Sequence, residues 1–285
     1  MKLHVRHETR YAFDAPVKRL VQSHRLWPAD NAAQRVLSWS VDVPGGVVGA
    51  SFRDGAGDMT QTVSVRGPVT ELTVTVEGQI ETADTAGVLK GHRELVPPSA
   101  YLTATRRTAL TAELRGLSRD ALDGLEGAGT LDRAHALMRA VANAIAFVPG
   151  ETEPATTASE ALNGGQGVCQ DHTHVLIAIA QAADIPARYV TGYLLSTADS
   201  VGDEAGHAWA ELWVDGLGWV GFDAANRKCP DATYVRLGSG FDSHDAAPIR
   251  GVLHGQAGET LGVSVSVSQA GQAQQQSQGA GQRQQ

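Results

Sequence analysis

Several features that would each indicate a class of protein are scarce or missing in this sequence. It has two cysteines in 285 residues, Cys169 and Cys229, which does not fit a disulfide-stapled scaffold and favours a reducing compartment. The formal net charge is −8 and there is no basic stripe, so nothing indicates nucleic-acid binding. No run approaches the roughly 20 apolar residues needed to cross a bilayer, and the N-terminus lacks the apolar core of a signal peptide. We therefore expect a soluble, cytoplasmic protein with no membrane partner.

The first third of the chain shows the apolar alternation of strands and no convincing helical period. Apolar residues alternate with charged ones from Leu3 to Tyr11, and with polar ones from Leu37 to Val43. The segment Asp54-Gly55-Ala56-Gly57 is a strong hairpin signal. Short strands separated by turn residues predict an N-terminal antiparallel β-sandwich domain at residues 1–85, with a structural or substrate-guiding role.

Helical spacing replaces the strand pattern from about residue 86. An amphipathic stripe runs from Leu131 to Ile145, with Thr130 at the N-cap position. An alternating run at Leu261–Val267 predicts a last strand, so we assign residues 86–268 to a second, catalytic domain. Residues 269–285 are almost entirely Gln, Gly, Ala and Ser, which cannot bury enough apolar surface to fold, and a disordered tail is expected there.

One cysteine lies where a nucleophile would be useful. A glycine-rich approach, Gly164 to Gly167, leads to Cys169 at the start of an apolar helical run. The first turn of a helix has unpaired amide N–H groups and the positive end of the helix dipole, which favour a thiolate. A buried structural cysteine is the alternative, but the polar neighbours Gln170 and Asp171 argue against it.

The two histidines that follow, His172 and His174, raise the question of a zinc site with Cys169. At about 100° per residue, they lie roughly 300° and 140° around the helix from the cysteine, on nearly opposite sides. They therefore cannot easily converge on one ion, and the spacing lacks the paired ligands of structural zinc. We expect no metal, with His174 partly buried against a hydrogen-bond partner and His172 exposed near the site.

A base and its orienting carboxylate follow on a predicted hairpin. Residues 206–214 alternate strictly, Asp215-Gly216 turns the chain, and residues 219–223 return antiparallel. The return brings Asp223 back towards His207, where its carboxylate can accept a ring N–H and stabilise the imidazolium. The other ring nitrogen can then take a proton from Cys169. Each residue alone is weak evidence, but the conjunction predicts a nucleophile, a base and an orienter.

These segments resemble the transglutaminase-like superfamily, within the papain-like group of thiol enzymes, and its bacterial subgroup in particular. The matching pieces are Gly167-Val168-Cys169-Gln170-Asp171, Ile185-Pro186-Ala187-Arg188-Tyr189-Val190, Gly206-His207-Ala208-Trp209 and Trp219 with Phe222-Asp223. The resemblance implies an α+β fold with a papain-like core behind an N-terminal β domain. It also implies a triad of Cys169, His207 and Asp223 with neither a metal nor an organic cofactor.

The sequence departs from the family pattern just after the predicted acid. Relatives often have Asp-Pro-Thr-Asn there, whereas this chain has Asp223-Ala224-Ala225-Asn226. The acid is kept, but the proline that stiffens the following loop is lost. The rigidity of that loop is therefore in doubt, while the triad itself is intact.

The expected reaction is acyl transfer at amide bonds of a peptide or protein. Cys169 attacks the carbonyl, and His207 protonates the leaving amine and then activates the acceptor. The Cys169 backbone N–H is the expected oxyanion donor, with Gln166 as a candidate second donor. Hydrolysis is favoured, and crosslinking of glutamine to amines and a catalytically silent binding module are the alternatives.

Ser196–Ala205, a polar segment before the histidine, is expected to form a mobile rim or a plain loop. The sequence does not indicate an oligomeric state.

Overall fold

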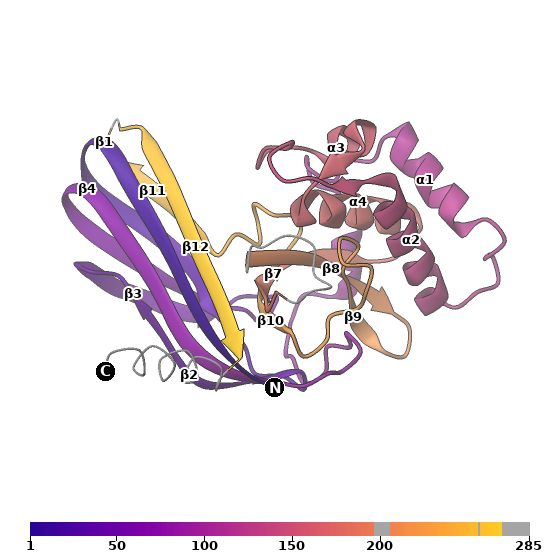
Figure 1. The fold of residues 1–285 in the computed structure, drawn as a ribbon, viewed down its shortest axis with the longest axis horizontal. Helices are drawn as coiled ribbons and strands as arrows, with labels where there is room; N and C mark the ends of the chain where they lie inside the picture. The colour runs from indigo at the N-terminus through magenta and orange to yellow at the C-terminus, as the bar shows by residue number, and fades with distance from the viewer. Residues whose placement is uncertain (197–205, 256, 270–285) are drawn as a thin grey trace, which may run out of the picture.

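The computed structural model describes residues 1–196, 206–255 and 257–269, so the predicted rim segment and the predicted tail lie almost wholly outside the described residues. The chain forms two bodies that lie side by side, one built of long strands and one in which helices cover a small sheet (Figure 1). None of the helices in the described ranges is long and apolar enough to cross a membrane.

The strand-rich body is organised around two very long strands, β1 (Lys2–Trp27) and β4 (Met59–Thr82), which pair antiparallel. Their first and last stretches take different partners. Residues 3–13 of β1 pair with β12 (Glu259–Gln269), and residues 19–24 pair with β11 (Ile249–His254). In the same way β4 pairs with β2 (Gln34–Asp42) at one end and with β3 (Gly46–Arg53) at the other, which completes a six-stranded sheet.

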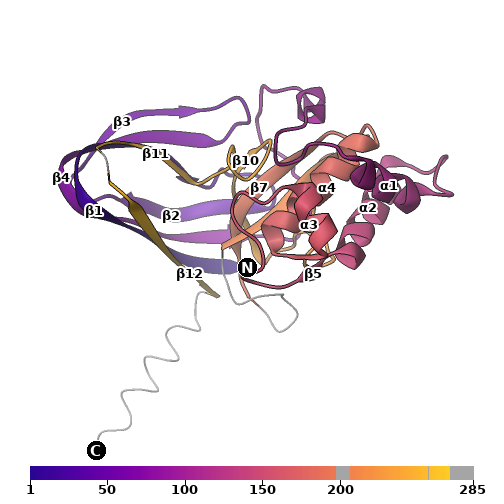
Figure 2. The ribbon, with the colours of Figure 1, turned by 90° about the horizontal axis from the view of Figure 1, so that it is seen from above.

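This sheet folds over on itself. Register shifts interrupt the β1–β4 ladder between Ala12 and Arg19, and beyond them the two halves of the sheet form two layers (Figure 2). An apolar core that draws on both halves includes Phe13, Leu20, Leu26 and Val74. The predicted N-terminal β domain is confirmed, but the expected several short strands are largely two long ones that bend.

One part of the predicted domain division needs correction. Residues 249–268 were assigned to the catalytic domain, yet β11 and β12 pair with β1 and complete the N-terminal sheet. The alternation at Leu261–Val267 correctly indicates a strand. It fixes which residues share a face and leaves open which of two sheets the strand joins.

The second body packs helices on a four-stranded antiparallel sheet. The sheet order is β10 (Tyr234–Gly240), β7 (Ala187–Leu194), β8 (Gly206–Val214), β9 (Gly218–Phe222). Around it lie α1 (Ala112–Leu122), α2 (Thr130–Ala144), α3 (Ala158–Gly164) and α4 (Cys169–Ala182), with a short 3₁₀ turn η1 (Pro98–Leu102) and a two-residue pairing of β5 (Ala146–Phe147) with β6 (Gln166–Gly167). The predicted α+β class is confirmed.

Helix α4 is the centre of this body. Every residue from Asp171 to Gln181 is buried, and the helix packs against β8, α1, α2 and α3. Its middle, Val175 to Ala180, is apolar on all sides and must be covered on all sides, and the other helices and the sheet do this. Its first residue, Cys169, is half-buried and lines a cleft.

The two bodies meet through an apolar contact and a buried charge cluster. Leu3 and Val5 of β1 pack with Tyr193, Val235 and Leu237 of the second sheet. Next to this contact, the guanidinium of Arg236 bonds Asp58 in the β3–β4 hairpin at 2.8 Å and Glu211 of β8 at 2.9 Å. Both bodies therefore contribute buried groups to one interface, and this fixes the N-terminal sheet beside the helical unit.

Candidate active site

The start of α4 is fixed by a carboxylate two residues after Cys169. Asp171 is buried and accepts hydrogen bonds from the backbone N–H of Val168 at 2.8 Å and the hydroxyl of Thr152 at 2.6 Å. A Cβ on Gly167 would lie 2.7 Å from the Asp171 side chain, so only glycine allows this close approach. The carboxylate also complements the positive end of the helix, and Cys169 is thereby held in a fixed orientation.

His207 lies at the start of β8 and contacts both other predicted residues. Its Nε2 donates to Oδ2 of Asp223 at 2.6 Å. With Nε2 engaged by the carboxylate, the remaining nitrogen Nδ1 is the one available to the hydrogen bond between His207 and Cys169. The structure therefore brings the three residues predicted from sequence into one chain of contacts, in the order Cys169, His207, Asp223.

Electrostatics in this group favour a charged imidazole. Burial alone would lower the pKa of His207, but the charge of Asp223, its hydrogen bond and the contact with Cys169 outweigh it and raise the pKa to about 10. Burial would likewise raise the pKa of Asp223, and the neighbouring His207 and Asn226 lower it instead. A histidine paired in this way keeps its proton at neutral pH and can serve as an acid.

Asp223 has more partners than the sequence indicates. Besides His207, its Oδ2 accepts a hydrogen bond from the hydroxyl of Tyr234 at 2.7 Å and one from the side-chain amide of Asn226 at 2.8 Å. Its Oδ1 accepts from the Asn226 backbone N–H at 3.1 Å. The carboxylate is thus held by donors from a loop and from β10 as well as by the imidazole of His207.

Two aromatic rings cover the imidazole of His207. Trp209, two residues on along the same face of β8, stacks on it with ring centroids 6.4 Å apart, and Tyr234 meets it edge-on at 5.9 Å. A Cβ on Gly192 would lie 2.7 Å from the Trp209 ring, so this glycine makes room for it. Trp209 could have been found from its alternation with His207, whereas nothing near Tyr234 in the sequence marks it.

The loop whose rigidity the sequence put in doubt is closed by backbone bonds. Asp223 and Lys228 exchange N–H···O hydrogen bonds of 2.8 and 3.1 Å, which form an isolated bridge. Arg227 takes a positive φ of 58° at this turn and donates to the Asn143 side chain at 2.8 Å and to the Ala142 carbonyl. These contacts hold the loop after Asp223 in place, which is the role expected of the missing proline.

Three secondary expectations have mixed outcomes. His174 is fully buried and accepts a hydrogen bond from the Ser243 backbone N–H at 3.1 Å, and burial lowers its pKa to about 4, as expected for a core histidine. His172 was expected to be exposed and is buried, with its ring nitrogens 2.9 and 3.1 Å from the carbonyls of Val168 and Ile145. Gln166 is exposed and is not among the residues that line the cleft at Cys169, so nothing in the structure supports it as a second donor.

Cys169 and His207 open into a cleft of about 460 Å³ between the two bodies. The helical body contributes residues such as Tyr189 and Gly206, and the N-terminal sheet contributes His7, from β1.

The second cysteine, Cys229, lies elsewhere, and burial and the charge of Asp84 raise its pKa to about 11. Among the described residues, no group of three or more His, Cys, Asp or Glu side chains could hold a metal ion.

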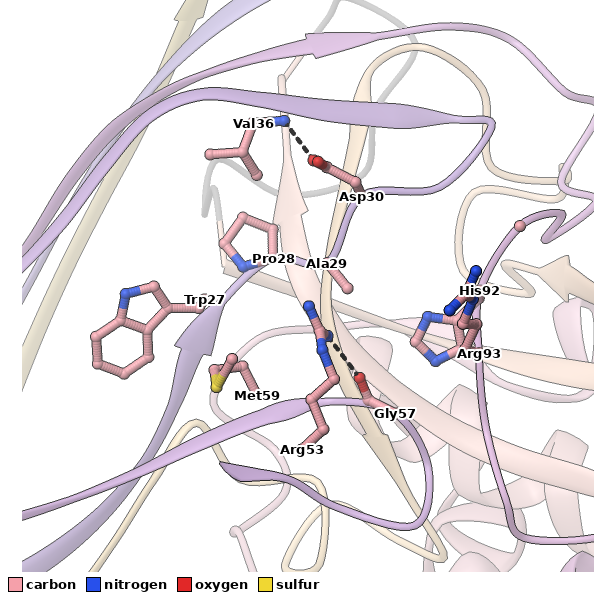
Figure 3. Close-up of a pocket in the computed structure, with 11 residues that line it drawn as sticks. Trp27, Pro28, Ala29, Asp30, Val36, Arg53, Gly57, Met59, His92 and Arg93 are labelled. Atoms are coloured by element: carbon pink, nitrogen blue, oxygen red, sulfur yellow. Dashed lines mark hydrogen bonds between the residues drawn. The ribbon is translucent and has the colours of Figure 1, made fainter. Parts of the chain in front are cut away.

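A second cavity, of about 570 Å³, lies where the N-terminal sheet meets the connection to the helical body (Figure 3). Two of its polar side chains bond the protein's own backbone: Arg53 donates to the Gly57 carbonyl at 3.0 Å, and Asp30 accepts from the Val36 N–H at 2.8 Å. Neither Cys169 nor His207 lines this cavity, whereas both line the cleft between the two bodies.

Comparison with known proteins yields two family matches and several relatives. Residues 119–224 match the transglutaminase-like superfamily, and residues 3–81 match the bacterial transglutaminase-like N-terminal region. An uncharacterized protein of Mycobacterium leprae is 26% identical over 94% of this chain and 98% of its own length. An uncharacterized protein of Mycobacterium tuberculosis (strain H37Rv) is 27% identical over 92% and 91% of the two chains.

The fold has a counterpart among solved structures. A candidate cysteine protease from Cytophaga hutchinsonii superposes with a TM-score of 0.72 at 21% identity, over 95% of this chain and 91% of that one. Because so much of both chains superposes, the pairing of a folded-over N-terminal sheet with a helical unit is shared between the two proteins.

Proposed function

We propose that this chain is a thiol enzyme of the transglutaminase-like superfamily, whose model matches residues 119–224, and that it transfers acyl groups from amide bonds of peptides or proteins, with water as the favoured acceptor. The observation that carries the proposal is the chain of contacts from Cys169 through His207 to Asp223, open to a cleft large enough for a peptide segment. A nucleophile, a base and an orienting group in this arrangement are the requirements of covalent acyl transfer.

In the first half-reaction the Cys169 sulfur attacks the amide carbonyl carbon. The new S–C bond forms as the carbonyl oxygen takes up negative charge, and the backbone N–H of Cys169, in the first turn of α4, has no partner within its helix and can donate to that oxygen. His207 then gives its Nδ1 proton to the amide nitrogen, the C–N bond breaks, and the amine leaves.

In the second half-reaction the neutral His207 takes a proton from a water molecule, whose oxygen attacks the thioester carbon. The C–S bond breaks, the carboxylic acid leaves, and the imidazolium beside Cys169 is restored. Asp223 holds Nε2 throughout and stabilises the positive charge each time the ring is protonated. If a primary amine replaces water, the same steps yield a crosslink.

The name of the Cytophaga hutchinsonii protein supports hydrolysis over crosslinking, because its fold matches across both bodies. In the test, the native protein and the Cys169→Ala variant are each incubated with a peptide mixture that contains glutamine and with a labelled primary amine. New peptide termini support hydrolysis, incorporated label supports crosslinking, and Cys169→Ala should yield neither. Full activity in Cys169→Ala would refute the proposal.

A catalytically silent binding module is distinguished by thiol reactivity. The Cys169 thiol lies at a helix start beside an imidazolium, whereas the pKa of Cys229 is raised to about 11. Iodoacetamide near neutral pH should therefore alkylate Cys169 at least about tenfold faster than Cys229, as peptide mapping would show. Equally slow alkylation of both would favour the silent module.

A further inference from the structure

One wall of the cleft at Cys169 comes from the last strand of the N-terminal sheet. On β12, Leu261 pairs with Tyr11 of β1, and Val263 pairs with Thr9. Directly paired residues point to the same side of a sheet, and both β1 residues face inward and are buried. The β12 side chains on this side are not covered: Leu261 is 54% exposed and Val263 is 58% exposed. Both line the same cleft as Cys169 and His207.

The wall reaches the base itself. Val265, the next β12 residue on this side, also lines the cleft, and a Cβ on Gly206 would be 3.8 Å from its side chain. Gly206 directly precedes His207 in β8. The apolar side chains of β12 therefore begin within one residue of the imidazole and extend away from it along the strand.

The wall is held in place through its neighbour β1. His7, which pairs with Val265, bonds the hydroxyl of Tyr193 on β7 at 2.9 Å through Nδ1, and its Nε2 is 2.9 Å from the hydroxyl of Thr9. Burial lowers the pKa of His7 to about 4, so the ring is neutral and adds no charge to the cleft. The wall is thus tied to the sheet that positions His207.

Apart from the His207 imidazolium, the cleft lacks charged side chains of its own. No Lys, Arg, Asp or Glu is among its lining residues, all of which belong to the described part of the chain. Away from His207, along β12, an ammonium or carboxylate side chain would lose its hydration without gaining a partner, whereas an aliphatic side chain would gain by leaving water. Exposed apolar residues gathered at a reactive centre are typical of a binding surface.

We propose that Leu261, Val263 and Val265 of β12 form a specificity subsite that selects peptides with an aliphatic side chain beside the amide attacked by Cys169. The inference rests on the proposed thiol chemistry and adds to it a substrate class. It gives the N-terminal domain a direct role, because one face of its last strand contacts the substrate. The occupant is an uncharged, branched side chain such as leucine or valine.

The test uses peptidyl chloromethyl ketones of one length, which alkylate an active-site thiol whether the natural acceptor is water or an amine. In one set of reagents, the residue that carries the reactive carbon is varied among Leu, Ser, Lys and Asp. In a second set, the residue before it is varied in the same way. The expected result is that the Leu reagent labels Cys169 about tenfold or more faster than the Ser, Lys and Asp reagents, since each methylene bound in an apolar pocket is worth about tenfold.

Two substitutions show whether β12 sets this preference. Val263→Arg should abolish the advantage of the Leu reagent and make the Asp reagent the fastest, because it places a cation on a β12 wall that carries no charge of its own. Val252→Arg is the matched control: Val252 is a 75% exposed strand valine on β11 that does not line the cleft, and the profile should stay native. Thermal unfolding should be native in both variants, and iodoacetamide labelling of Cys169 should be native in Val252→Arg.

The outcomes separate this inference from the proposed function. If iodoacetamide labels Cys169 rapidly but the peptide reagents show no side-chain preference, or Val263→Arg leaves the preference native, the subsite is refuted and the thiol chemistry stands. If Cys169 is alkylated no faster than Cys229, the proposed function fails and the subsite fails with it.

Discussion

Two buried charge clusters lie four residues apart on the same face of β8. His207, at the start of the strand, pairs with Asp223, while Glu211, further along, pairs with Arg188 and Arg236. Both clusters are removed from water, and both compensate each buried charge with an opposite one. They differ in the cation: an imidazolium can give its proton to a neighbouring reacting group, whereas a guanidinium cannot.

The difference in cation matches the difference in surroundings. The His207 cluster opens into the cleft, where a proton can be given to a substrate. The Glu211 cluster is closed: Arg188 is covered by the rings of Trp219 and Tyr101, and Arg236 reaches across to Asp58 of the N-terminal body. One strand therefore supplies a chemical group at one end and an attachment between the two bodies at the other.

Substitution of Asp223 by Asn tests the first half of this comparison and has the largest expected effect. The amide removes the charge that raises the pKa of His207 to about 10, so that pKa should fall towards or below its ordinary value of 6.5. Turnover should drop by about 10³-fold, and the alkaline limb of the pH–rate profile should move to lower pH.

The same change has a stability signature with a fixed sign. A folded-state pKa raised above the unfolded value of 6.5 adds stability that is full below pH 6.5 and is lost as the pH rises towards 10. Denaturant unfolding of the native protein should show that decline, and Asp223→Asn should show less of it. An unchanged alkaline limb in the variant would mean that His207 is not the titrating acid.

Substitution of Glu211 by Gln tests the second half, and its effect should appear in stability. Burial would raise the pKa of Glu211, but Arg236 and Arg188 lower it to about 2, so the carboxylate is charged at all ordinary pH values. Its loss leaves two buried guanidiniums each with one remaining carboxylate, Asp58 or Glu94. We expect a loss of about 3 kcal/mol in the free energy of unfolding, measured by denaturant titration.

The matched control is Glu81→Gln, which breaks the Arg35–Glu81 pair. That pair has a comparable N···O distance of 2.6 Å but lies on the exposed surface, where solvent screens it. Little or no loss of stability is expected from it. If Glu211→Gln destabilises no more than this control, the buried cluster is not what joins the two bodies.

The sequence predicts the site better than it predicts the domain division. Cys169, His207 and Asp223 lie in segments whose local patterns are strong: a helix start, an alternating strand and its hairpin return. The hairpin register alone brings the last two together, since Ala210 pairs with Phe222. Contacts within such local units follow from periodicity, and this is why they could be predicted.

Features that depend on distant pairing could not be predicted. The strand at Leu261–Val267 was found, but its pairing with β1, more than 240 residues earlier, is not encoded in its alternation. The contact between Tyr234 and Asp223 has the same origin, because it depends on β10 lying beside β7. His172 was expected on the surface because helical angles give directions around a helix and do not show what covers each side.

Substitution of Tyr234 by Phe has the smallest expected effect and tests whether the Tyr234 hydroxyl alters the pKa of His207. The variant removes only the hydroxyl that donates to Asp223 Oδ2 and leaves the ring against His207 in place. A carboxylate with one donor fewer is a stronger acceptor for His207, so the pKa of the imidazole should rise and the alkaline limb should move slightly to higher pH. Turnover should fall by no more than about tenfold, since the loss of one hydrogen bond to a charged group is worth about 1.5 kcal/mol. The direction of the limb is the decisive readout, because it is opposite to that of Asp223→Asn. A shift to lower pH would show that the hydroxyl does not act on the imidazole by weakening Asp223 as its acceptor.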